Sequence, residues 1–216
     1  MPGDYRHEPS HPGMKHLLGG GPDGNEQLTA ATGIVLIVLL AALGITIVRI
    51  GQLTWLHFFL GLLLIGPVAL KLASTGYRFT RYYTNSPSYR RRGTPESWLR
   101  LLAPVVILST VVVFVSGVVL MYDGPAHRDP ALLIHKASFF VWIGATALHV
   151  LGHLIGLPAA LRAASSDRDS ARRGQAGGIG RVIALIGAIV AGVVLAIALI
   201  PDFSIWTAHL SLLGSR

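Results

Sequence analysis

The sequence predicts an all-α, polytopic membrane protein built as a bundle of five transmembrane helices. Of its 216 residues, 52% are hydrophobic and only 13% are charged, and the mean hydropathy is +0.58. That is too apolar for a soluble domain of this size. Five apolar stretches are each long enough to cross a bilayer, and polar or basic segments separate most of them. The predicted spans cover residues 28–48, 53–75, 101–121, 132–157 and 182–200.

The two ends of the chain are predicted to lie outside this bundle. Residues 1–27 are polar, rich in Gly, Pro and His, and show no helical or strand period, so we expect a disordered tail. The first span is longer than the apolar part of a signal peptide, and no basic flank precedes it, so its pattern is not that of a cleavable signal peptide. Residues 201–216 form a second tail, in which Trp206 suits a membrane interface. The first and fifth spans are assigned packing roles only.

The basic residues predict the orientation. Most of the 18 Lys and Arg residues lie in two segments, between the second and third spans and between the fourth and fifth. The positive-inside rule places both segments in the cytoplasm of a plasma (inner) membrane protein, with the N-terminus inside and the C-terminus outside. The net charge of +8 is therefore a topology signal, with anionic lipid headgroups as a further partner. Nothing else in the sequence indicates nucleic-acid binding.

Cofactor chemistry is limited by the absence of cysteine. The chain cannot hold an iron–sulfur cluster through thiolates, attach a c-type haem covalently or form disulfides. Any redox centre must therefore be held by histidine or by non-covalent contacts.

The fourth span carries three histidines, His135, His149 and His153, within an otherwise apolar helix. Ionisable side chains inside a membrane span usually face the protein interior and mark a functional site. His135 and His149 are fourteen residues apart, so they share a helix face at a separation of roughly 21 Å. His57 lies about four residues into the second span, which runs in the same direction as the fourth. It therefore matches the depth of His135, and the two could ligate one haem iron from opposite sides.

A second ligand pair is less clear, because Lys71 stands fourteen residues after His57, at the position opposite His149. Lys71 could ligate iron, snorkel to the headgroups, pair with a haem propionate or hydrogen-bond a quinone, and we favour snorkelling or propionate pairing. His153 adjoins His149 and could replace it, hold a propionate or lie among the headgroups. The sequence thus predicts one haem b and leaves a second haem open.

Glycines accompany the histidines in the helices. Gly61 and Gly144, with Gly66 and Gly117, could let a flat macrocycle approach the backbone. They could equally allow close packing of helices, as small residues do in membranes.

The arrangement of His57, His135 and His149 resembles the membrane cytochrome b fold, shared by the cytochrome b subunits of respiratory complexes, hydrogenases and formate dehydrogenases. The likeness covers residues 53–157. It implies that His57 and His135 are axial ligands of an outer haem and that His149 is a ligand of an inner one.

Two further features qualify this resemblance. Lys71 stands where the family would have a fourth histidine. Residues 99–154 are also similar to poorly described actinobacterial membrane proteins.

The expected function is that of a b-type cytochrome, carrying electrons between a quinone pool and a redox partner. A separate redox subunit would supply any flavin or molybdenum chemistry, so no catalytic residue is assigned. Two alternatives remain open: a haem-free transporter, with His57, Lys71, His135 and His149 forming a proton or metal-ion path, and a membrane scaffold or assembly protein. The predicted spans contain no Asp or Glu, which a proton path would more usually include. The oligomeric state stays open.

Overall fold

The computed structural model describes residues 21–84, 86–90, 97–166 and 178–206, with the side chains of 89, 90, 97–100 and 153–166 left out. No strand occurs in this part of the chain, so the predicted all-α class is confirmed. The helices are α2 (Gly21–Val48), α3 (Ile50–Tyr83), α4 (Pro87–Arg90), α5 (Ser97–His127), α6 (Asp129–Ser166), α8 (Gly178–Ala198) and the 3₁₀ turn η1 (Ile200–Phe203).

Five of these helices, α2, α3, α5, α6 and α8, are long and apolar enough to cross a membrane. The chain is therefore a multi-pass membrane protein, as predicted. Each helix begins before its predicted span, and α3, α5 and α6 also end after it. An apolar stretch marks only the hydrocarbon layer, and a helix can continue into the polar region around it. Residues 21–27, predicted to lie in the N-terminal tail, form the first turns of α2. Pro22 suits an initial turn, and the carboxylate of Asp23 suits a helix N-terminus.

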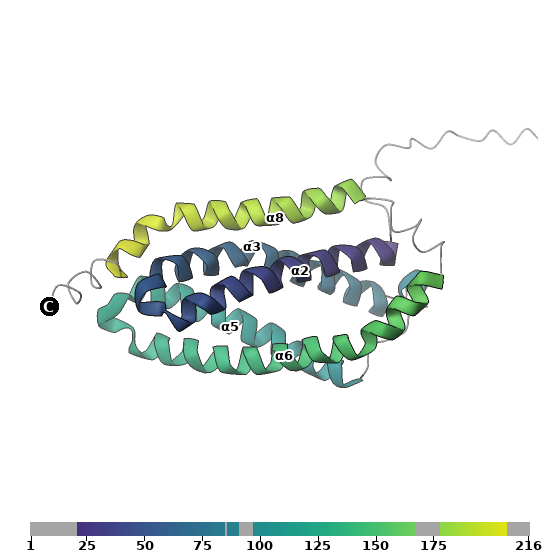
Figure 1. The fold of residues 1–216 in the computed structure, drawn as a ribbon, viewed down its shortest axis with the longest axis horizontal. Coiled ribbons are helices and arrows are strands. Elements are labelled where there is room, and N and C mark those ends of the chain that lie inside the picture. Colours follow the sequence, from purple (N-terminus) through teal and green to yellow (C-terminus); the bar gives the residue numbers. More distant parts are fainter. Residues whose placement is uncertain (1–20, 85, 91–96, 167–177, 207–216) are drawn as a thin grey trace, which may run out of the picture.

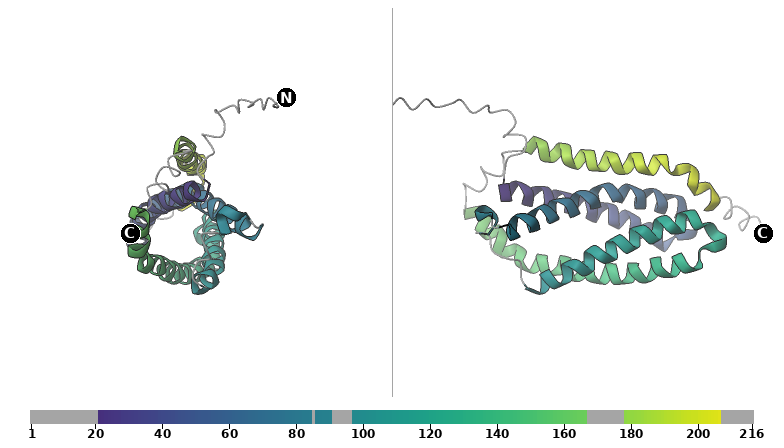
Figure 2. Two further views of the ribbon diagram at one scale, coloured as in Figure 1. Left: turned by 90° about the vertical axis from the view of Figure 1, so that its right-hand side faces the viewer. Right: turned by 180° about the vertical axis from the view of Figure 1, so that it is seen from behind.

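The helices pack as two antiparallel hairpins. One joins α2 to α3, the other joins α5 to α6, and α8 packs along α3 (Figure 1). Seen end-on, α2, α3, α5 and α6 lie around a common axis, with α8 outside them (Figure 2). The hairpins meet mainly where α3 touches α5. The two hairpin turns and η1 lie at one end of the bundle.

Two glycines bring α3 and α8 into close contact. A Cβ atom at Gly66 would lie 2.0 Å from the carbonyl oxygen of Ala188, and one at Gly192 would lie 2.0 Å from that of Leu63. No side chain fits at either position. Of the two roles open to Gly66, the structure shows close helix packing.

A small core closes the end of the bundle that contains the hairpin turns. Leu62, Met121, Ala196 and Phe203 are buried there, and Phe58 packs against them. Trp206 ties η1 to α5 by donating its indole N–H to the Met121 carbonyl at 3.0 Å. Residues 201–206 were predicted to be part of the outer tail, but they pack onto the bundle. Phe203 contacts Phe58, the residue that follows His57 in the sequence.

Candidate functional site

His57 lies in the first turns of α3 and is held by the end of α2. Its Nδ1 atom is 2.8 Å from the hydroxyl of Thr46, which is 1% exposed. The Thr46 oxygen also lies 2.5 Å from the Leu43 carbonyl, which can only accept. A hydroxyl has one hydrogen, and here it goes to Leu43, so Thr46 accepts from His57. The proton of the neutral imidazole is therefore on Nδ1, and Nε2 carries a lone pair.

His135 lies near the start of α6 and is held by α5. Its Nδ1 atom is 3.0 Å from the Val113 carbonyl and 3.1 Å from the Ser116 hydroxyl, which itself donates to Val113. A carbonyl cannot donate, so Nδ1 carries the hydrogen. Gly117 leaves room for the ring, because a Cβ there would lie 3.1 Å from Cε1 of His135.

His57 and His135 each lie in the first turns of the helix that follows a hairpin bend, and both bends lie at one end of the bundle (Figure 1), so the two histidines share that end. Within the described helices, no hydrogen bond involves Nε2 of either ring. Metal-ligating histidines are commonly oriented by a hydrogen bond from the other ring nitrogen, which also raises the basicity of the ligand. The described residues form no group of three or more potential metal-ligating side chains.

Lys71 is directed at α2. Its ammonium donates to the Thr29 carbonyl at 2.6 Å, and a Cβ at Gly33 would lie 3.2 Å from it. Two further hydrogen bonds link the same helices: Asn25 Nδ2 donates to the Ser74 carbonyl at 3.1 Å, and Thr29 Oγ1 to Ser74 Oγ at 3.1 Å. Lys71 is therefore part of a polar connection between α2 and α3, which none of its four predicted roles included.

The second ligand pair that the sequence leaves open is His149 with Lys71. His149 is half-buried on α6, on the His135 face. His153 belongs to α6, but its side chain lies outside the described residues.

Gly61 and Gly144, both predicted to lie near a haem, differ in their positions relative to the histidines. Gly61 lies one turn after His57 on the same face of α3, and the space where its Cβ would lie is open to 4 Å. Gly144 also borders open space, but it lies about 180° around α6 from His135 and is exposed. Of these two glycines, Gly61 is therefore the one that shares a helix face with a predicted ligand.

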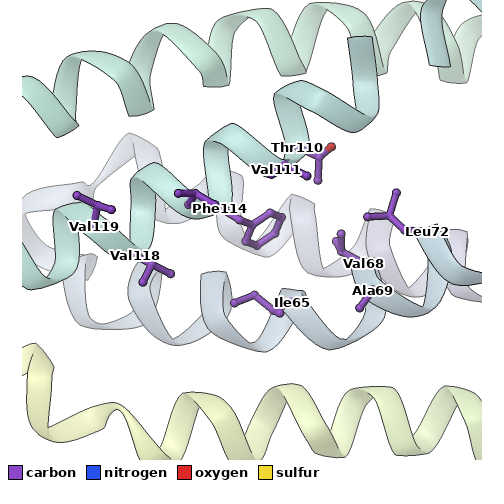
Figure 3. Close-up of a pocket in the computed structure, with 10 residues that line it drawn as sticks. Ile65, Val68, Ala69, Leu72, Thr110, Val111, Phe114, Val118 and Val119 are labelled. Atoms are coloured by element: carbon purple, nitrogen blue, oxygen red, sulfur yellow. The ribbon is translucent and has the colours of Figure 1, made fainter. Parts of the chain in front are cut away.

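A groove of about 390 Å³ lies apart from these residues, between α3 and α5 (Figure 3). Ile65 and Leu72 of α3 and Phe114 and Val118 of α5 are among its ten lining residues, none of which is a histidine or lysine. Apart from Thr110, the lining is apolar and matches the hydrocarbon chains of a bilayer.

Thr46 and Ser116 were not expected from the sequence. Thr46 lies in a span to which only packing was assigned, yet it holds a site histidine. Thr46 and His57 are about equally far in sequence from the bend between α2 and α3, so an antiparallel hairpin places them at one depth. That symmetry is the signal that could have identified the pair.

Comparison of the chain with family models, with curated proteins and with solved structures finds no match. The geometry of the two histidines and their hydrogen-bond partners is thus the observation that bears on function.

Proposed function

We propose that this protein is an integral membrane b-type cytochrome that binds one haem b between α3 and α6, with His57 and His135 as axial ligands. One observation carries the proposal: two histidines from different helices, at the same end of the bundle, each have Nδ1 hydrogen-bonded and Nε2 free of hydrogen bonds in the described part of the chain. A porphyrin supplies the four in-plane nitrogens of its iron, so two axial nitrogens complete the coordination.

Several residues of the chain would hold and orient such a group. Thr46 orients His57, while Val113 and Ser116 orient His135. Open space beside Gly61 leaves room for a flat ring next to His57. The apolar helices exclude water, which favours the less charged form of a redox centre. When bound, haem supplies a one-electron redox couple, and the protein tunes its potential through these ligands and their hydrogen bonds.

The position of the site favours electron transfer between a quinone pool in the bilayer and a redox partner at the surface. We place the N-terminus in the cytoplasm and the histidine pair towards the outer face. Support comes from the charge distribution: α3 ends and α8 begins at the end of the bundle away from the histidines (Figure 1), and these ends carry Arg78, Arg81 and Arg181.

Lys71 supports one haem rather than two. Its amine is used in a hydrogen bond to Thr29 on α2, so α3 offers no second ligand opposite His149 in this arrangement.

An optical spectrum of the purified protein in mild detergent, oxidised and then reduced with dithionite, tests the proposal. We expect a b-type reduced spectrum, and a pyridine haemochrome assay should give about one haem per chain. A folded, monodisperse protein that stays colourless after haem supplementation during expression would overturn the cytochrome proposal and favour haem-free ion transport or scaffolding.

A further inference from the structure

The two histidines are held by chemically different acceptors. His135 donates towards a backbone carbonyl, that of Val113, with the Ser116 hydroxyl as a second acceptor. His57 has a single partner for Nδ1, the hydroxyl of Thr46. A side-chain substitution can remove the acceptor of His57 but cannot remove the carbonyl that holds His135.

Thr46 is unusually well fixed as an acceptor. Its only hydrogen goes to the Leu43 carbonyl at 2.5 Å, so its oxygen faces His57 with lone pairs alone. At 1% exposure, the side chain is also shielded from water that could compete for the bond. The hydroxyl therefore selects one tautomer of His57, the one with Nε2 free to bind a metal.

We propose that Thr46 is a positioning residue that sets the tautomer and the ligand strength of His57, and through them the reduction potential of the haem. This inference rests on the proposed function and deepens it. An acceptor at Nδ1–H makes the imidazole a stronger electron donor. A stronger donor stabilises ferric over ferrous iron, so the Thr46 hydroxyl lowers the potential.

Three variants test this role. Thr46→Val keeps the shape of the side chain and removes the acceptor. Thr46→Ser restores the acceptor. Ser116→Ala is the matched control, because it removes a hydroxyl from the other histidine while the Val113 carbonyl remains.

The first readout is a redox titration of the haem-loaded variants, together with haem affinity. Thr46→Val should raise the midpoint potential and weaken haem binding by roughly 10- to 100-fold. Thr46→Ser should return both values towards wild type, and Ser116→Ala should change both much less than Thr46→Val. A Thr46→Val protein with wild-type potential and affinity would overturn the inference and leave the proposed function standing.

The second readout needs no haem. Nitrogen NMR shifts of the haem-free protein should report the Nδ1–H tautomer for His57 in wild type and a mixture of tautomers in Thr46→Val. A wild-type protein with the proton of His57 on Nε2 overturns the inference, even if the variant fails to fold. A wild-type protein that shows the Nδ1–H tautomer but never binds haem would instead overturn the proposed function.

Discussion

His57 on α3 and His135 on α6 present the same ring nitrogen, although each is held by a different helix and a different chemical group. A threonine hydroxyl on α2 fixes the first, and a backbone carbonyl on α5 fixes the second. In both cases the Nδ1 atom is occupied and Nε2 is left without a hydrogen bond in the described part of the chain. Each ring is therefore held in the way that metal-ligating histidines commonly are.

Gly117 should be required for the position of His135. A Cβ atom there would lie 3.1 Å from Cε1 and 3.4 Å from Nδ1, so Gly117→Ala must displace the ring by a few tenths of an ångström. We expect weaker haem binding, measured as haem per chain under limiting haem. Gly144→Ala is the control, since nothing lies within 4 Å of its Cβ position. Equal haem content in both variants would contradict the role of Gly117.

Gly61 should border the bound haem. Gly61→Leu fills the open space one turn from His57 and should lower haem content while the haem-free protein remains folded. Gly44→Leu serves as the control, because that glycine also borders open space but points about 200° away from Thr46 around α2. Full haem occupancy in Gly61→Leu would show that the haem lies elsewhere.

Lys71 should act as a tie between helices. Lys71→Met removes the hydrogen bond to Thr29, so thermal unfolding in detergent should show a loss of about 1 kcal/mol. Lys71→Gln keeps a donor and should lose less. Haem per chain should be the same in both variants as in wild type. A loss of haem in Lys71→Met would mean that this residue contacts the cofactor.

The α3–α8 contact should tolerate no side chain at Gly66. A Cβ there would overlap the Ala188 carbonyl, so Gly66→Ala must push α8 away. We expect the thermal unfolding transition in detergent to report a destabilisation of about 1–3 kcal/mol, typical of overpacking. Gly187→Ala on α8 has open space and should unfold like wild type; if Gly66→Ala does so too, the close contact is wrong.

Hydropathy predicted the five spans because each helix must present an apolar surface to lipid. The helix ends were placed less well, since α3 runs on to Tyr83 through residues that the headgroup region accommodates. The pairing of His57 with His135 as ligands stays a prediction from helix direction and depth, to which the structure adds the hydrogen-bond partner of each ring. The contact of Lys71 with Thr29 did not, because sequence spacing gives the face of a helix but not the rotamer of a long side chain or the neighbour it meets.

The sequence also did not show which face of the first span packs against the second. The residues of the first span look uniform in hydropathy, so hydropathy does not distinguish Thr46 from Thr32, which is also fully buried. Thr46 differs in its distance from the bend, and in the structure it meets His57, whereas Thr32 donates only to its own helix at Leu28.

The central claim is that His57 and His135 bind one and the same haem. Haem per chain, measured by pyridine haemochrome for wild type and for His57→Ala, His135→Ala and His149→Ala, tests it most directly. The account predicts about one haem in wild type and in His149→Ala, and none in either of the other two variants. A haem that survives in both His57→Ala and His135→Ala, or is lost only in His149→Ala, would contradict it.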